Sequence, residues 1–185
     1  THHISCNETE IHLLKYDEFS PTEYLDKLTP EEIARLSSFK SASRKREFVA
    51  VRILRDYLLG LEPIHYNAVG APYIDKEVFI SISHSKNTVG FALNKEYSIG
   101  LDLEYPQEKI LKIQSKFISE SEQQNFDTND LKAITTLWSA KEAMYKLAGR
   151  NKITFCSELL LSPSSKNTLE GTIINHDHQL KVNLD

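Results

Sequence analysis

Hydrophobic residues return along this chain at two different spacings, which predict where its helices and strands lie. Around residues 43–59 and 129–148, apolar side chains recur every three to four positions, the period of a helix with one buried face. Gly60 and Gly149 directly follow these segments, and glycine is the residue that most often ends a helix. We therefore expect two long helices, Ser43–Leu59 and Asn129–Ala148.

Shorter apolar or alternating segments predict antiparallel strands and the turns between them. They lie at residues 11–16, 78–83, 88–93 and 97–104, with turns at 94–96 and 162–167 and a C-terminal hairpin or meander at 153–161 and 172–184. Ser20 and Thr29 each precede a proline and are followed three residues later by a glutamate, which is the pattern of a helix capping box. Two short helices should begin there, and two more are expected at 107–117 and near 119–121.

The order of these helices and strands favours an α+β fold made of two halves. Residues 48–52 and 138–142 align at an offset of 90 positions, and each segment lies inside one of the long helices. We expect residues 1–95 and residues 96–185 to form the halves. Each would consist of a long helix packed on a small antiparallel sheet.

Composition and charge exclude several classes of protein. The chain has 185 residues and a net charge of −4, which excludes nucleic-acid binding through bulk positive charge. No apolar run approaches the roughly 18 residues of a membrane span, and Thr1–Cys6 lacks the basic and apolar segments of a signal peptide. Cys6 and Cys156 are too few for a disulfide framework. We expect a cytoplasmic protein with two reduced thiols.

Three carboxylates and a lysine form the main candidate site. In the strand expected at 97–104, Asp102 and Glu104 point to the same side, where two like charges repel each other. Glu142 and Lys146 lie four residues apart in the second long helix, and hence on one face. A Mg²⁺ ion would offset the repulsion, because it takes oxygen ligands beside substrate phosphates. A strand end in solvent and a surface Glu–Lys pair are the alternatives.

Two further groups of polar residues have the chemistry to bind phosphate. Ser83 and His84 lie at the end of an expected strand, with Lys86 close behind them. An ordinary polar strand end is the alternative, and a Ser–His hydrolase is disfavoured because no G-x-S-x-G turn is present. The second group begins the first long helix and consists of Lys40, Arg44, Lys45 and Arg46. It suits phosphate binding, for which arginine gives bidentate contacts, or it is a charged surface face.

Four motifs follow one another along the chain in a distinctive order. They are Gly70-Ala71-Pro72, Ser81–Ser85, G-x-D-x-E at 100–104 and W-x-x-K-E-x-x-x-K at 138–146. Together they resemble the motifs of the 4′-phosphopantetheinyl transferase superfamily, in its Sfp-type, holo-acyl-carrier-protein synthase-like form. The last two motifs, at this separation, are the most specific. The resemblance runs from about Leu28 to beyond Phe155.

The resemblance implies a metal site and a catalytic set. Asp102, Glu104 and Glu142 fall on the acids that bind Mg²⁺, or Mn²⁺, in the family. Lys146 falls on the lysine that contacts the phosphates of coenzyme A. Asp102, Glu142 and Lys146 would be the catalytic residues. Glu142 is the first choice for the base that takes the serine proton, directly or through a metal-bound water, and Glu104 is the second.

The resemblance also implies how coenzyme A is bound. Ser83 and His84 fall on the pair that meets the nucleotide phosphate end, and Arg46 falls near an arginine that contacts the 3′-phosphate. Many family members have a lysine where this chain has Ala71. A phosphate or adenine contact from that lysine is therefore absent here, and the spacing leaves open whether Lys76 or Lys86 replaces it.

The implied reaction transfers the 4′-phosphopantetheine arm of coenzyme A to a serine hydroxyl of an acidic acyl or peptidyl carrier protein. Adenosine 3′,5′-bisphosphate is the second product. The resemblance further implies a monomer whose halves are related by a pseudo-twofold axis, with the cofactor at their interface. Two other functions are the alternatives. One is a related protein that binds coenzyme A or a carrier without turnover, and the other is an unrelated magnesium-dependent phosphate-ester hydrolase.

Overall fold

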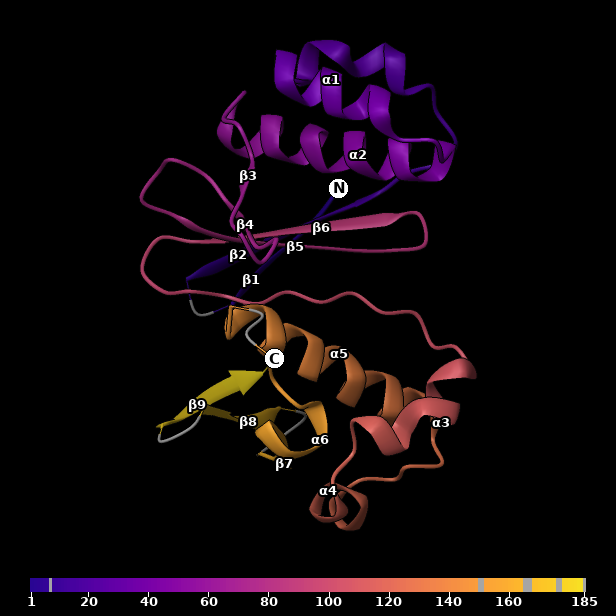
Figure 1. Cartoon of the computed structure of the whole chain (residues 1–185), viewed down its shortest axis with the longest axis vertical. Coiled ribbons are helices and arrows are strands. Elements are labelled where there is room, and N and C mark those ends of the chain that lie inside the picture. Colours follow the sequence, from indigo (N-terminus) through magenta and orange to yellow (C-terminus); the bar gives the residue numbers. More distant parts are fainter. Residues whose placement is uncertain (7, 150–151, 165–167, 176–177, 185) are drawn as a thin grey trace. The chain divides into compact units, whose positions relative to one another are not determined.

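The computed structural model describes residues 1–6, 8–149, 152–164, 168–175 and 178–184. By its internal contacts the chain divides into two compact units, Thr1–Leu103 and Glu104–Asp185. Both units combine helices with antiparallel sheets, which confirms the α+β class (Figure 1). The boundary expected after residue 95 stays a prediction. Among the described helices, none is long and apolar enough to cross a membrane.

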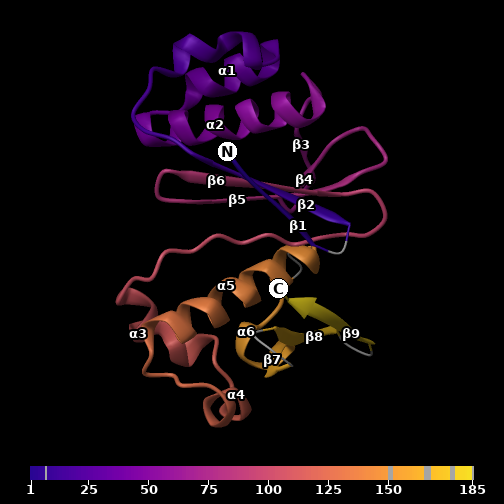
Figure 2. The same cartoon turned by 180° about the vertical axis from the view of Figure 1, so that it is seen from behind.

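The first unit is a four-stranded antiparallel sheet with helices on one face. Its strands, in the spatial order β1-β2-β6-β5, are β1 (His2–Cys6), β2 (Thr9–Lys15), β6 (Thr88–Asn94) and β5 (Phe79–Ser85). A short ladder pairs β3 (His65–Tyr66) with β4 (Pro72–Tyr73). The helices are η1 (Pro21–Lys27), α1 (Pro30–Ser38) and α2 (Ala42–Leu59). Within this unit α2 lies against the sheet, and α1 lies on the side of α2 that faces away from it (Figures 1 and 2).

Helix α2 covers the sheet with an apolar face. The helix ends at Gly60, whose φ of 72° needs a residue without a β-carbon, as the sequence predicts. Ala50 and Leu54 pack against Val89 and Phe91 of β6, and all four are at most 1% exposed. Burial of this kind is the main stabilising contribution to the unit.

A buried carboxylate joins α1 to α2. The capping box expected at Thr29 forms, because Glu32 Oε2 accepts a hydrogen bond from the Thr29 N–H at 3.1 Å. Glu32 also accepts from Arg52 Nε at 3.0 Å and from Arg55 Nη2 at 2.8 Å. All three charged side chains are buried, so each ion depends on its partners.

Three expectations for the first unit are wrong or incomplete. Residues 98–103 form no strand, because the backbone N–H groups of Leu101 and Leu103 bond to serine side chains instead of a ladder. The capping box expected at Ser20 does not form, because the Ser20 hydroxyl bonds to the Thr22 hydroxyl, and the helix that follows, η1, is a 3₁₀ helix. Strand β1 was not expected, because four of its five residues are exposed and it lacks an alternating apolar face.

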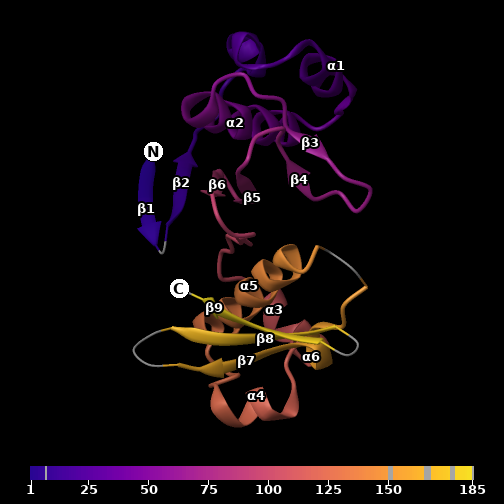
Figure 3. The same cartoon turned by 90° about the vertical axis from the view of Figure 1, so that its left-hand side faces the viewer.

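The second unit packs one long helix on a three-stranded sheet. The elements are α3 (Lys109–Ile113), η2 (Gln114–Lys116), α4 (Glu120–Asn125), α5 (Leu131–Leu147), α6 (Phe155–Glu158), β7 (Leu159–Pro163), β8 (Leu169–Asn175) and β9 (His178–Leu184). Helix α5 runs along one face of the β7-β8-β9 meander (Figure 3). The helix expected over 107–117 is shorter, and its last turn is the 3₁₀ element η2. The turn expected at 162–167 lies partly outside the described residues.

The contact between α5 and its sheet is close. Met144 of α5 is fully buried, and a β-carbon added at Gly171 of β8 would lie 2.8 Å from its sulfur. Glycine is therefore required at that point of the sheet. Helix α5 begins at Asp130, whose carboxylate accepts from two backbone N–H groups, and Gly149 follows it with a φ of 74°. Both ends of this helix agree with the prediction.

Candidate functional site

In the first unit, two serines of β5 hold the segment that carries Asp102. Ser83 is buried, and its hydroxyl donates to Asp102 Oδ1 at 3.1 Å while accepting from the Leu103 N–H at 3.0 Å. Ser81 accepts from the Leu101 N–H at 2.9 Å. Because Ser81 and Ser83 point to the same side of the strand, they dock residues 101–103 along β5 and orient the Asp102 carboxylate.

Ser83→Ala removes both of these contacts and is expected to lower the free energy of unfolding by about 1–3 kcal/mol, because the Leu103 N–H loses its acceptor. Ser81→Ala is the matched control, since it costs a similar amount of stability but leaves Asp102 oriented. Chemical denaturation of both variants checks the stability. If Asp102 acts in the reaction, only Ser83→Ala should lower activity well beyond the fraction unfolded. Equal losses of activity in both variants would contradict a positioning role.

His84 belongs to a charged network between β5 and α2. Its Nδ1 lies 3.1 Å from Glu47 Oε2, and its Nε2 lies 3.5 Å from Arg44 Nη1. The Glu47 carboxylate can only accept a hydrogen bond, and the Arg44 guanidinium can only donate one. The neutral tautomer of His84 that fits both partners therefore carries its proton on Nδ1 and accepts at Nε2. Arg44 also forms an ion pair with Glu47. His84 and Arg44 are both exposed, so an anion in solvent can reach this group.

The arginine beside His84 is Arg44 and not the one singled out by the sequence. Arg46 Nη2 lies 3.3 Å from Glu18 Oε1, and the two form an ion pair. Its contact with a 3′-phosphate stays a prediction. Arg44 is a further candidate for that contact, because its guanidinium already bonds to the imidazole of the Ser83–His84 pair.

In the second unit, Trp138 of α5 holds Glu104. The indole Nε1–H donates to Glu104 Oε1 at 3.2 Å. The indole ring packs against Phe117 and Phe155, with ring centroids 4.9 and 5.5 Å away. These contacts fix the ring, so its N–H points in a defined direction at an otherwise exposed carboxylate.

Trp138, Glu142 and Lys146 follow one another at four-residue intervals along α5. This spacing places them on one face of the helix, one turn apart, and all three side chains are half-buried. The hydrogen bond from Trp138 therefore brings the Glu104 carboxylate beside the face that carries Glu142 and Lys146. Oxygen donors and an ammonium group on one face suit a divalent cation and a phosphate.

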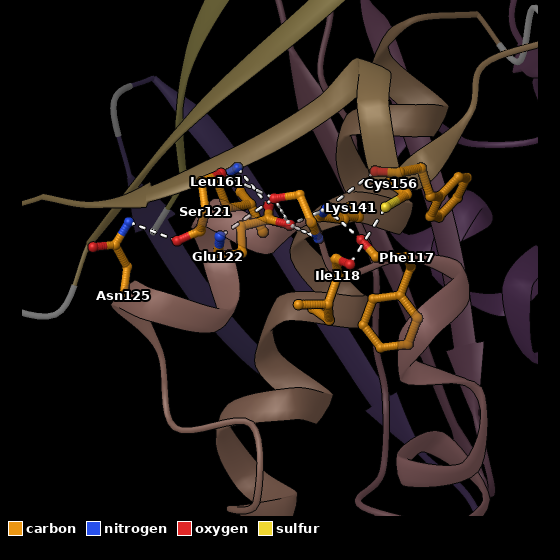
Figure 4. Close-up of polar contacts among 10 residues, drawn as sticks. Phe117, Ile118, Ser121, Glu122, Asn125, Lys141, Cys156 and Leu161 are labelled. Atoms are coloured by element: carbon orange, nitrogen blue, oxygen red, sulfur yellow. Dashed lines mark hydrogen bonds and ion pairs between the residues drawn. The ribbon is translucent and has the colours of Figure 1, made fainter.

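Lys141, within the same motif, is fully buried and points toward Glu122 of α4 (Figure 4). Its ammonium donates to Glu122 Oε2 at 2.7 Å, to the Phe155 carbonyl at 3.0 Å and to the Phe117 carbonyl. Glu122 in turn accepts from the Leu161 N–H at 2.8 Å. Burial lowers the pKa of Lys141, and the Glu122 carboxylate opposes that shift. Lys141 thus joins α5 to α4, α6 and β7.

The sequence is similar to known proteins over part of its length. Residues 98–184 match the family described as the 4′-phosphopantetheinyl transferase superfamily. The chain is 29% identical over 163 residues to the 4′-phosphopantetheinyl transferase HetI of Nostoc sp. (strain PCC 7120). It is 27% identical over 116 residues to the 4′-phosphopantetheinyl transferase gsp of Aneurinibacillus migulanus. Over these residues the chain is similar to the 4′-phosphopantetheinyl transferase superfamily.

The match to these phosphopantetheinyl transferases is partial in length. The alignment with HetI covers 76% of this chain and 69% of HetI, and the alignment with gsp covers 57% of this chain and 48% of gsp. The chain therefore spans about half to two thirds of these relatives. The part that matches the family includes Glu104, Trp138, Glu142 and Lys146.

The three acids of the predicted metal site are divided between the two units. Asp102 belongs to the first unit, and Glu104 and Glu142 belong to the second. Asp102 and Glu104 each have one carboxylate oxygen oriented by a neutral donor, Ser83 and Trp138 respectively. Carboxylate oxygens are the ligands that Mg²⁺ and other hard divalent cations take in proteins.

Sequence reasoning missed the burial of Lys141, although a signal was present. Positions 134, 137, 141 and 144 follow the spacing of a buried helix face, and the other three are Ile134, Leu137 and Met144. A lysine on such a face must be paired. The contacts made by Arg44 and Trp138 carry no comparable signal, because their partners lie 40 and 34 residues away along the chain.

Proposed function

We propose that this protein is a member of the 4′-phosphopantetheinyl transferase superfamily and transfers the 4′-phosphopantetheine arm of coenzyme A to a serine hydroxyl of an acyl or peptidyl carrier protein. The observation that supports it best is the hydrogen bond from Trp138 to Glu104, beside the helix face that bears Glu142 and Lys146. Glu104 comes from one of the two most specific family motifs, and Trp138, Glu142 and Lys146 come from the other. HetI and gsp are both described as 4′-phosphopantetheinyl transferases.

In this proposal Asp102, Glu104 and Glu142 hold a Mg²⁺ ion, or Mn²⁺. The ion supplies charge neutralisation at the pyrophosphate of coenzyme A. The serine hydroxyl of the carrier forms a bond to the β-phosphorus as the bond to the leaving adenosine 3′,5′-bisphosphate breaks. Glu142 takes the serine proton, with Glu104 or a water as the alternatives. Lys146 stabilises the negative charge that grows on the leaving phosphate.

The nucleotide end of coenzyme A would meet Ser83, His84 and Arg46. Ser83 Oγ already contacts Asp102, so its role combines ligand contact with positioning of that acid. Lys76 forms an ion pair with Glu62 at 3.0 Å, which makes it a poor substitute for the lysine that Ala71 replaces. Lys86 lies in the turn that follows His84 and is the other candidate.

The remaining parts of the proposal concern the whole protein and its partner. We infer that the two units are similar halves of a pseudo-twofold fold, that the protein acts as a cytoplasmic monomer and that its carrier is acidic. The chain as a whole carries a charge of −4, so its net charge would not attract an acidic carrier. The attraction would instead come from local basic side chains such as Arg44 and Lys86.

The release of adenosine 3′,5′-bisphosphate distinguishes a transferase from the two alternatives, a phosphate-ester hydrolase and a protein that binds coenzyme A without turnover. The purified chain is mixed with coenzyme A and Mg²⁺, with and without an apo carrier protein, and the nucleotide products are resolved by chromatography. A transferase releases the bisphosphate only when the carrier is present. Release without carrier would mean a hydrolase, and no release in any mixture would mean a binding protein.

Lys146→Ala is expected to lower kcat by at least roughly 10²-fold, the scale of losing one preorganised donor. Coenzyme A affinity, measured by calorimetry, should change much less, because the ammonium group acts mainly on charge that develops in the transition state. Lys146→Arg should rescue only part of the rate, since a guanidinium restores the charge at a different position. A normal kcat with a slightly lower melting temperature would mean that Lys146 only forms a surface pair with Glu142.

A further inference from the structure

A separate cluster of metal-ligating side chains lies on the sheet of the first unit. It consists of His3 on β1 and of Glu10 and His12 on β2, which we call the edge cluster. Each residue offers one ligand atom, and these atoms all lie within 4.8 Å of one another. No residue of the proposed catalytic set belongs to the edge cluster.

The register of the sheet brings the three side chains together. His3 pairs directly with His12 across the antiparallel β1–β2 ladder, so both rings lie on the same face of the sheet. Glu10 is two residues from His12 and shares that face. The two rings stack with centroids 4.5 Å apart, and Glu10 Oε2 lies 3.5 Å from His12 Nε2.

The chemistry of these donors selects the kind of ion. Two imidazoles and a carboxylate suit Zn²⁺ and related transition metals, whereas Mg²⁺ prefers oxygen ligands alone. Ligand atoms about 2.0–2.2 Å from a tetrahedral Zn²⁺ lie roughly 3.3 Å from one another. His3 and Glu10 are exposed and their side chains are free to rotate toward the buried His12, which would shorten the spacing of the ligand atoms.

We propose that His3, Glu10 and His12 bind one Zn²⁺ ion, with water completing the coordination, and that the ion fastens β1 to β2. Strand β1 is an edge strand with four of its five residues exposed, so few apolar contacts hold it. A metal ligated from both strands would order it by favouring the paired state over the frayed one.

Strand alternation provides matched controls within β1 itself. His2 and Cys6 lie on the opposite face from His3, because side chains of neighbouring residues in a strand alternate. His2→Ala therefore removes an identical side chain next to the edge cluster without removing a ligand. Cys6 is a stronger zinc ligand than histidine. If Cys6 bound the ion instead, the Co²⁺ spectrum would show a thiolate-to-metal charge-transfer band.

The test is a titration of the whole chain with Co²⁺, whose visible absorption reports coordination, followed by displacement with Zn²⁺. We expect one Co²⁺ per chain, a d–d band without a thiolate band, and no displacement by millimolar Mg²⁺. His3→Ala should abolish the band, and Glu10→Gln should weaken binding by at least roughly tenfold, because loss of a ligand costs no less than loss of an outer-shell partner. His2→Ala should bind as the wild type does.

Hydrogen exchange supplies a second measurement that does not depend on the Co²⁺ spectrum. Zn²⁺ should slow exchange of the β1 amides in the wild type and in His2→Ala, and should leave His3→Ala unchanged. His3 is exposed, so its substitution leaves the rest of the sheet folded, which circular dichroism checks. Equal weakening by His2→Ala and His3→Ala, a stoichiometry of one ion per two chains, or a thiolate band would each overturn the proposal.

Discussion

Asp102→Asn is expected to lower kcat/KM for transfer by roughly 10³-fold, because a metal supplies several kcal/mol of charge stabilisation in the transition state. Asparagine keeps the shape of the side chain and can still accept the hydrogen bond from Ser83, so the docked segment 101–103 should remain in place. Only the charge is lost. Steady-state kinetics at saturating Mg²⁺ with an apo carrier measures the effect.

Thermal melting provides the complementary readout for Asp102. If the acid belongs to a metal site, the wild type should melt at a higher temperature in Mg²⁺, and Asp102→Asn should lose that increase. Glu108→Gln is the control, because Glu108 is an exposed acid just beyond Glu104 whose side chain makes no cap hydrogen bond. Activity of Asp102→Asn close to that of the wild type would show that this acid holds no catalytic metal.

Lys141→Met is expected to destabilise the second unit by about 3–5 kcal/mol, since it leaves the buried Glu122 carboxylate without its counter-charge. Two backbone carbonyls, those of Phe117 and Phe155, lose their donor as well. Chemical denaturation followed by Trp138 fluorescence measures the loss, because that indole packs beside both phenylalanines.

A double-mutant cycle tests whether the loss comes from the ion pair. Lys141→Met with Glu122→Gln removes both charges and should be less destabilised than the sum of the single variants, by about 0.5–3 kcal/mol. Lys132→Met changes an exposed lysine of the same helix and should stay within about 0.5 kcal/mol of the wild type. Strict additivity would contradict direct coupling. A lost kcat with unchanged stability would make Lys141 catalytic and not structural.

Periodicity and capping predicted most of this fold. The long helices α2 and α5 were expected within one or two residues at each end, because strong apolar stripes and terminal glycines mark them. Strand β1 was missed because edge strands with polar residues carry little periodic signal. The extended segment at 98–103 was taken for a strand, because the sequence does not reveal that serine side chains replace its ladder partners.

The candidate site was predictable in its residues but not in their supporting contacts. Motif spacing singled out Asp102, Glu104, Glu142 and Lys146, and their roles remain proposals. The donors that orient two of these acids, Ser83 and Trp138, lie 19 and 34 residues away from them in sequence. Such contacts depend on tertiary packing, which local patterns do not record. The family resemblance grouped the motifs into one candidate site, and the structure identified Ser83 and Trp138 as the hydrogen-bond donors to Asp102 and Glu104.

The mass of the carrier protein tests the central claim most directly. An apo carrier is incubated with the chain, coenzyme A and Mg²⁺, and its intact mass is measured. The account predicts a gain of one phosphopantetheine arm on a single serine, absent when that serine is replaced by alanine and nearly absent with Asp102→Asn. An unmodified apo carrier in the wild-type mixture, across acyl and peptidyl carriers, would contradict it.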